Sequence, residues 1–280
     1  MKIILGDNQF FGVNHHDIVK GDKTKNQFDN NKIIISFINK ALDIGMAGYM
    51  INSNKRGFEI ASKLVARSNC EVHYSVPYPH KYAAMVNENG LFALLKHVLK
   101  QSSLSSMFLK LPKFIFTRDV KHMLPLILDL EIPRNLKKGS CVYLQNVVTD
   151  LLIGLKRHDI IELYCNYLIE LGFKPGLITL NPVILEKIVS SFEVKLQQEL
   201  IVCFNINKDG FNVFPDLIAV EDFVLRKSHF KKMGMSILSS GGSTSITESL
   251  DYIKRMPLQY VVFGSSSINN IKFNIEYLTK

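Results

Sequence analysis

Two stretches near the end of the sequence decide the fold, GMSILSSGGS (Gly234–Ser243) and YVVFGSSS (Tyr260–Ser267). Each begins as an apolar run of strand length and ends in a cluster of glycine and serine. Between them, Ser245 and Glu248 stand in the spacing of a capping box, which opens a helix reaching to about Met256. A strand, a turn and a helix in this order make up a parallel βα unit. We therefore predict that the chain ends in two such units.

The same pattern repeats back to the start of the chain. Short apolar runs alternate with longer stretches of helical period, such as Ile33–Ile44, Ile160–Leu171 and Ile268–Leu278. The runs are continuously hydrophobic, as in strands that are covered on both faces. Eight such units predict an α/β fold, a single (β/α)8 TIM-barrel domain over residues 1–280. The predicted strands are Lys2–Gly6, Gly48–Ser53, Glu71–Pro77, Cys141–Val147, Gly176–Asn181, Leu200–Asn205, Gly234–Ser239 and Tyr260–Gly264.

Two connections between the predicted strands are long. Residues 7–32 are polar and are expected to form a loop on the side of the active site. Residues 78–140 form a long insertion after the third strand, with a helix expected near Leu91–Lys100. The insertion also contains the apolar stretches Lys113–Thr117 and Met123–Leu130. One of these two stretches is a candidate ninth strand, because a short apolar run does not by itself distinguish a strand from a helix.

The composition is that of a globular protein. The chain has 47% hydrophobic and 21% charged residues, and no stretch reaches the roughly 20 apolar residues that a membrane-spanning helix requires. The apolar run at the amino terminus is too short for a signal peptide, and the four cysteines show neither a CxxC pair nor a metal-ligand spacing. We therefore expect a cytoplasmic protein with reduced, buried cysteines and no membrane partner.

Much of the net charge of +9 lies in one segment. Residues 81–140 contain ten Lys or Arg and four Asp or Glu, a net of +6. The sequence contains no zinc-finger spacing, RGG run or RRM signature, so we expect no nucleic-acid partner. A basic flap over a small anionic substrate explains the segment, and a solvated basic surface or RNA binding are the alternatives. The sequence is also compatible with a homo-oligomer.

In a TIM barrel the ligand site lies at the carboxyl ends of the strands. Glycine and serine follow the seventh and eighth predicted strands, next to the starts of two helices. Glycine lets backbone N–H groups approach an anion and a helix amino end favours negative charge, although both residues are also ordinary turn and cap residues. We predict a phosphate-binding site formed by Ser239, Gly241, Gly242, Gly264, Ser265 and Ser266.

Carboxamides follow most of the other strands. An amide both donates and accepts hydrogen bonds, which suits a polyhydroxylated ligand such as a sugar, while a cation there would neutralise an anion. The alternative is that these amides satisfy hydrogen bonds of neighbouring loops. The predicted substrate-binding residues are Asn8, Asn52, Arg56, Gln145, Asn146, Asn181 and Asn205.

Few ionisable residues stand at the strand ends to act as acid or base. Asp7 ends the first strand, His80 follows the third, and Lys208 follows the sixth, where a lysine could also form a Schiff base. We predict these three as the catalytic residues. The adjacent His15 and His16 point in different directions and lack a second ligand cluster, so no metal is expected.

The final third of the chain resembles the aldo-keto reductases. The matching residues are Tyr260–Ser267, followed by Ile271 and Asn274, together with Met233–Leu238. Ala41–Gly45 is similar to the segment that leads into the second strand of that family. The resemblance implies a TIM barrel in which the Gly264–Ser267 segment lies against the phosphates of an NADP cofactor.

The catalytic tetrad of the family is not present at the matching positions. Where the second strand of the family gives Asp and then Tyr, this sequence has Asn52, Ser53 and Asn54. Ser75-Val76-Pro77 stands in place of the lysine, and Gln145 or Asn146 in place of the histidine. Amides cannot supply the proton that reduction of a carbonyl requires, so the usual chemistry of the family does not follow from the resemblance.

Beside the RNA binding named above, three functions that involve a small ligand therefore remain open from the sequence. The first is an isomerase, epimerase or lyase that binds a phosphorylated or nucleotide-linked polyhydroxy compound. The second is a divergent NAD(P)-dependent oxidoreductase related to the aldo-keto reductases, for which NADP is the implied cofactor. The third is a ligand-binding barrel without catalysis. All three predict a small anionic ligand at the phosphate loops.

Overall fold

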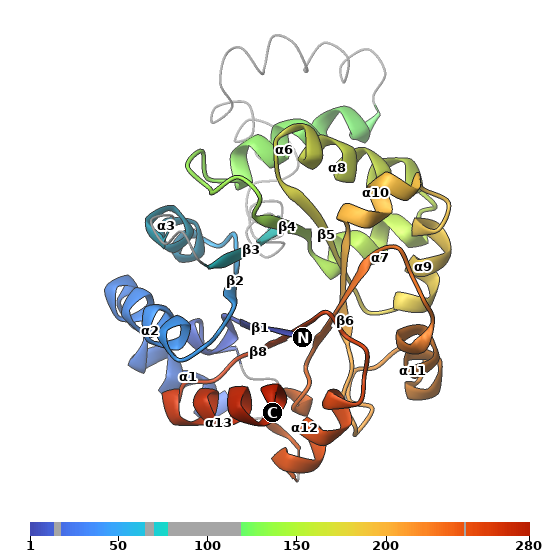
Figure 1. The fold of residues 1–280 in the computed structure, drawn as a ribbon. Helices are drawn as coiled ribbons and strands as arrows, with labels where there is room; N and C mark the ends of the chain where they lie inside the picture. The colour runs from blue at the N-terminus through green and yellow to red at the C-terminus, as the bar shows by residue number, and fades with distance from the viewer. Residues whose placement is uncertain (14–17, 65–69, 78–118, 244) are drawn as a thin grey trace.

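A computed structural model describes residues 1–13, 18–64, 70–77, 119–243 and 245–280. Eight parallel strands form one closed barrel in the order of the sequence, and the last strand pairs with the first (Figure 1). The predicted TIM barrel is therefore confirmed. The strands are β1 (Lys2–Leu5), β2 (Gly48–Asn52), β3 (Glu71–Val76), β4 (Cys141–Leu144), β5 (Lys174–Thr179), β6 (Ile201–Asn205), β7 (Lys231–Met235) and β8 (Tyr260–Phe263).

Helices surround the strands, as Figure 1 shows. None of the helices in the described ranges is long and apolar enough to cross a membrane. The α-helices are α1 (Ile18–Gln27), α2 (Asn31–Asp43), α3 (Lys55–Lys63), α6 (Leu124–Glu131), α7 (Asn146–Gly154), α8 (His158–Glu170), α9 (Pro182–Val189), α10 (Val194–Glu199), α11 (Leu217–Leu225), α12 (Ile246–Lys254) and α13 (Ile268–Thr279). Three 3-10 helices are η1 (Asn8–Phe10), η3 (Val120–Met123) and η4 (Ser239–Gly241).

Side chains alternate between the two faces of each strand. In β1, Ile3 and Leu5 belong to the large core between strands and helices, whereas Ile4 belongs to a smaller cluster inside the barrel. The same alternation in β4 places Cys141 and Tyr143 inside. Because the period of a strand is two residues, the residues that follow these positions by two also face the barrel axis.

Two sequence predictions about strands are corrected by the structure. Strand β7 ends at Met235 and not at Ser239, because Ser236 adopts a left-handed backbone with φ of 57°. The stretch Met123–Leu130 is no ninth strand, since it forms the end of η3 and most of α6, with a proline in the first turn. The other candidate, Lys113–Thr117, and most of the insertion lie outside the described residues.

The polar connection over residues 7–32 is not simply a loop. Its described residues contain η1 and α1, and three aromatic rings pack together where they meet α2. Phe10 and Phe28 lie edge to face with centroids 4.9 Å apart, and both contact Phe37 of α2 in the same manner. Phe10 and Phe28 are 1% exposed, so burial of these rings fixes the segment that follows β1.

A glycine in β5 makes room for a tyrosine ring inside the barrel. Gly176 is paired in register with Tyr143 of β4, whose ring is fully buried. A Cβ atom at Gly176 would lie 2.4 Å from Cδ1 of that ring. Because the interior is close-packed, the ring has no alternative position to move into.

We expect the substitution Gly176→Ala to lower the free energy of unfolding by about 1–3 kcal/mol, the usual cost of overpacking a core. Urea unfolding monitored by circular dichroism measures the change. Gly154→Ala is the matched control, because nothing lies within 4 Å of a Cβ atom there and alanine favours the helix. A loss in Gly176→Ala no larger than in the control would contradict this account, and adding Tyr143→Leu should restore part of the stability.

Candidate active site at the carboxyl ends of the strands

Polar side chains form the top layer of the barrel interior. Asn52 and Asn205 end their strands at positions that face the barrel axis, Ser75 does so one residue before the end of β3, and Gln145 continues this pattern after β4. The layers below them are apolar or aromatic, with Met50, Tyr143 and Cys203 among their members. The structure therefore brings Asn52, Gln145 and Asn205 to one mouth. Ser75, which the sequence analysis did not include, joins them.

Asp7 is held at this mouth by the neighbouring strand. Its Oδ2 accepts hydrogen bonds from the backbone N–H and from Nδ2 of Asn52, at 2.9 and 2.7 Å. Oδ1 of Asn52 in turn accepts from Nδ2 of Asn54 at 2.7 Å. Asn54 caps α3 by accepting from the Gly57 N–H. A Cβ atom at Gly57 would lie 2.0 Å from the carbonyl oxygen of Asn52, so the glycine allows α3 to begin directly against the end of β2.

The Asp7 carboxyl lies in an environment that disfavours its charged form. The side chain is 8% exposed, and burial raises its pKa from the ordinary value of 3.8 to about 6. The hydrogen bond from the backbone of Asn52 stabilises the carboxylate and limits the rise. A carboxyl that titrates near pH 6 can both release and accept a proton under neutral conditions.

A second carboxylate occupies the equivalent position beside β5. Asp150 of α7 accepts hydrogen bonds from Oγ1 of Thr179 and from the backbone N–H of Leu180 at 3.0 Å. Burial raises the pKa of Asp150 as well. At the mouth of the barrel, Nε2 of Gln145 donates to Oγ of Ser75 at 3.3 Å. The predicted Asn146 is the half-buried first residue of α7.

Several predicted site residues are engaged in holding the structure. Asn181 caps α9, and Nδ2 of Asn205 donates to the carbonyl oxygen of Asn212 in the following loop. Arg56 donates to Asn31 and to the carbonyl oxygen of Phe28. Asn8 is exposed at the start of η1, and Lys208 is exposed and ion-paired with Glu248. The role of His80 remains a prediction, since it lies outside the described residues.

The loop after β7 carries its own negative charge. Ser239, Ser240 and Gly241 all have positive φ, and the hydroxyl of Ser239 donates to the carboxylate of Asp209. Ser245 caps α12 by accepting from the Glu248 N–H, which places an acidic side chain in the first turn. This carboxylate already occupies the favourable field at the amino end of α12. The predicted residues Gly241 and Gly242 are exposed.

The loop after β8 offers a helix amino end without an acidic residue. Ser267 caps α13, and no acidic residue lies in the first turn of this helix. Oγ of Ser265 accepts from the Ser267 N–H, and Gly264 is exposed. A Cβ atom at Gly264 would lie 2.2 Å from Oε1 of Gln9, which is buried and has no hydrogen-bond partner. Of the two predicted phosphate loops, this one has the more favourable electrostatics.

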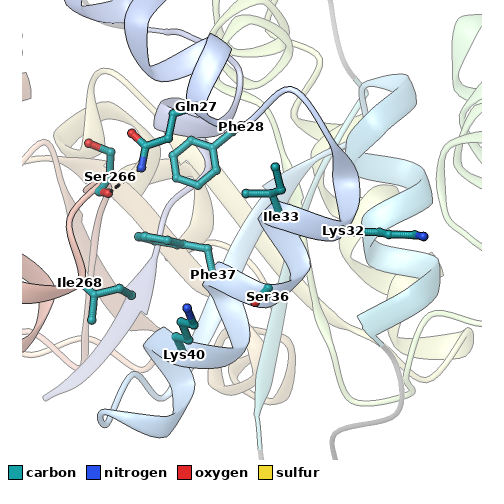
Figure 2. Close-up of a pocket in the computed structure, with 9 residues that line it drawn as sticks. All are labelled: Gln27, Phe28, Lys32, Ile33, Ser36, Phe37, Lys40, Ser266 and Ile268. Carbon is teal, nitrogen blue, oxygen red and sulfur yellow. Dashed lines mark hydrogen bonds between the residues drawn. The ribbon is translucent and has the colours of Figure 1, made fainter.

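A surface pocket of about 490 Å³ adjoins this loop (Figure 2). Nε2 of Gln27 points toward Ser266 and donates to its carbonyl oxygen at 3.4 Å. One face of α2 forms the opposite wall and includes Lys40. The complete lining consists of Gln27, Phe28, Lys32, Ile33, Ser36, Phe37, Lys40, Ser266 and Ile268. Within the described residues, no group of three metal-ligating side chains occurs.

Comparison with solved structures identifies the same barrel in aldo-keto reductases. A thermostable aldo-keto reductase bound to the inhibitor epalrestat is similar over 99% of this chain and 89% of its own, with 10% identity and a TM-score of 0.57. A putative aldo-keto reductase from Pseudomonas aeruginosa has 12% identity, the same coverage and a TM-score of 0.57. An aldo-keto reductase from Klebsiella pneumoniae in complex with NADPH has 10% identity, a TM-score of 0.56 and coverage of 99% and 85%.

No protein-family model and no curated protein matches the sequence. At 10–12% identity, the similarity to the aldo-keto reductases establishes the fold and its strand order. It agrees with the resemblance found in the final third of the sequence and extends it over nearly the whole chain.

The raised pKa of Asp7 makes stability depend on pH in a defined direction. The folded protein binds the proton of Asp7 more tightly than the unfolded chain does. The contribution of this group to the free energy of unfolding is therefore fully present below pH 4 and is lost as the pH rises through 6. A rise of about two units in the pKa of Asp7 corresponds to about 3 kcal/mol in the free energy of unfolding. Asp7→Asn, whose Oδ1 can still accept from Asn52, should not show this loss between pH 4 and 6.

Chemical unfolding from pH 3.5 to 8 measures the difference between the two proteins. Carbon-13 NMR of the aspartate carboxyls provides the direct measurement, with one signal titrating near pH 6 that is missing in Asp7→Asn. Asp29→Asn, an exposed position, is the control. An Asp7 signal that titrates near pH 4 would show that hydrogen bonding outweighs burial at this site.

Proposed function

We propose that this chain is a divergent NAD(P)-dependent oxidoreductase in which Asp7 supplies the proton that the missing tetrad residues supply in aldo-keto reductases. The observation that carries the proposal is the buried Asp7 carboxyl, whose pKa is raised by burial to about 6 and which is hydrogen-bonded to Asn52. The barrel of the Klebsiella pneumoniae neighbour binds NADPH, which supports a nicotinamide cofactor here.

The residues after β8 fit the phosphates of such a cofactor. Gly264 is exposed, and the amino end of α13 presents backbone N–H groups with no acidic side chain in the first turn. Ser265 and Ser266 would hold the phosphates together with these N–H groups, while the pocket beside Ser266 leaves room for other parts of the cofactor. The cofactor, when bound, would supply a hydride to a carbonyl carbon.

The chain's own residues would position the substrate and move the proton. Asn52 donates both of its hydrogen bonds to Oδ2 of Asp7, so Oδ1 is the oxygen on which a transferable proton would reside. Ser75 and Gln145, which are hydrogen-bonded to each other, would orient the substrate at the mouth. The apolar layer below them excludes water from the barrel interior.

A second candidate function rests on the same neutral polar mouth. Asn52, Ser75 and Gln145 can all donate and accept hydrogen bonds, which suits a phosphorylated or nucleotide-linked polyhydroxy substrate. Asp7 would then act as the acid or base of an isomerase, epimerase or lyase, with the substrate phosphate at α13. A barrel that binds such a ligand without turning it over is the third alternative, and the tests below separate the three.

Thermal unfolding with NADPH, sugar phosphates and nucleotide sugars tests which ligand binds. A ligand at 100 times its Kd adds about 2.7 kcal/mol of stability and raises the Tm. Asn269→Asp places a negative charge in the first turn of α13, and we expect it to weaken NADPH binding about tenfold while the helix remains stable. Thr247→Asp, at the same position of α12, is the matched control and should bind NADPH like the wild type.

Equal weakening by both variants would contradict the assignment of the phosphates to the β8 loop. A stabilisation by sugar phosphates alone would favour the second candidate function. No stabilisation by any of these anions would overturn the phosphate site itself.

Turnover tests the role of Asp7. For NADPH-dependent reduction of a panel of aldehydes, kcat/KM should fall as the pH rises through about 6, because only the protonated carboxyl donates. Asp7→Asn should lower kcat/KM about 100-fold or more and remove this pH dependence. Asp29→Asn serves as the control. Binding of NADPH without reduction in the wild type would indicate a barrel that lacks catalysis, and full activity in Asp7→Asn would exclude Asp7 as the proton donor.

A further inference from the structure

The pocket beside the β8 loop has apolar walls from two sides. Phe28 and Phe37 both contribute to its lining, and their rings lie edge to face with centroids 5.1 Å apart. Ile33 of α2 is 44% exposed and lies next to these rings (Figure 2). Ile268 adds an apolar side chain from the first position of α13. A flat apolar group of a ligand can therefore be covered from α2 and from α13.

Polar side chains of the same pocket can bind the edge of such a group. Nε2 of Gln27 donates to the carbonyl oxygen of Ser266 at 3.4 Å, and this amide also has a second N–H and an acceptor oxygen. Ser36 of α2 is exposed and supplies a hydroxyl. A nucleotide base combines an apolar face with donors and acceptors along its edge. The lining matches this combination better than it matches a sugar, which is polar on all sides.

The pocket also has the charge that a nucleotide requires. Lys32 and Lys40, both on α2, are the charged residues of the described lining, which includes neither Asp nor Glu. The resulting positive potential favours an anionic ligand, and the amino end of α13 acts in the same direction. The pocket volume of about 490 Å³ lies within the usual range for small-molecule sites.

The pocket adjoins the phosphate site that the proposed function assigns to the β8 loop. Ser266 and Ile268 belong to its lining, and Ile268 is the first residue of α13. At the other end of the loop, a Cβ atom at Gly264 would lie 2.2 Å from Oε1 of Gln9, two residues after Asp7. A ligand with its phosphate at α13 would therefore have the pocket on one side and the mouth of the barrel on the other.

We propose that the pocket binds the base of a nucleotide whose phosphate lies at the amino end of α13. The assignment rests on the phosphate site of the proposed function and narrows its ligand to a compound that contains a nucleotide, such as a nicotinamide dinucleotide or a nucleotide sugar. The base would lie between α2 and Ile268, with Gln27 and Ser36 at its edge. The remainder of the ligand would pass over the exposed Gly264 toward Asp7.

Comparison of adenosine 5′-phosphate with ribose 5-phosphate isolates the contribution of the base, because the base is what the second compound lacks. In isothermal titration calorimetry we expect a Kd about tenfold lower for adenosine 5′-phosphate, the order that packing of one base against aromatic side chains provides. Ser36→Trp fills the pocket from an exposed helix position and should remove this preference, while ribose 5-phosphate binds as before. Asn166→Trp, at an exposed position of α8, is the matched control and should retain it.

Saturation-transfer NMR of the wild type gives a measurement that does not depend on folding of a variant. The adenine ring protons should receive more saturation from the protein than the ribose protons, and the reverse order would overturn the proposal. Equal affinities of the two compounds for the wild type, or a preference that persists in Ser36→Trp, would overturn the base pocket and leave the phosphate site in place. Binding of neither compound would overturn both the phosphate site of the proposed function and the base pocket.

Discussion

Closure of the eight-stranded barrel is the constraint on which the rest of the structure depends. With β8 paired to β1, every strand has two neighbours and each residue faces either the barrel axis or the helices. The interior is therefore narrow, and its contents must fit together: the fully buried ring of Tyr143 requires a residue without a side chain at Gly176. The same alternation determines which polar residues reach the two ends. Asn52 and Ser75 reach the mouth because Met50 and His73, two residues earlier, face inward.

The pKa of Asp7 at the mouth of the barrel follows from a balance between burial and hydrogen bonding. Burial makes the charged form of Asp7 unfavourable, and two donors from Asn52 partly compensate. Burial is thus the main reason why the pKa of this carboxyl is raised to about 6.

The sequence was sufficient to predict the barrel and most of its elements, because continuous apolar runs and capping residues are local signals. Ser245 does cap α12, and α13 begins at Ile268 as expected. Errors arose where the backbone departs from these signals. The apolar run after Met235 reads as strand, yet the left-handed φ of Ser236 ends β7 there. Residues 7–32 look polar, yet Phe10 and Phe28 within them pack against each other and against Phe37. For the site, the carboxamides at the strand ends were visible in the sequence, but whether an amide faces the mouth or holds a loop, as Asn205 and Asn181 do, depends on three-dimensional contacts.

The two glycine- and serine-rich loops show that a sequence motif does not by itself determine where an anion binds. In sequence they are nearly equivalent, since both follow a strand and precede a serine-capped helix. Their electrostatics differ because of residues outside the motif. At the β7 loop, Asp209 accepts from Ser239 and Glu248 lies in the first turn of α12, so the helix field already acts on a carboxylate of the protein. At the β8 loop the first turn of α13 is neutral, and the same field remains free to act on a ligand. Anion binding at a helix amino end therefore depends on the neighbouring side chains as much as on the glycines that allow close approach.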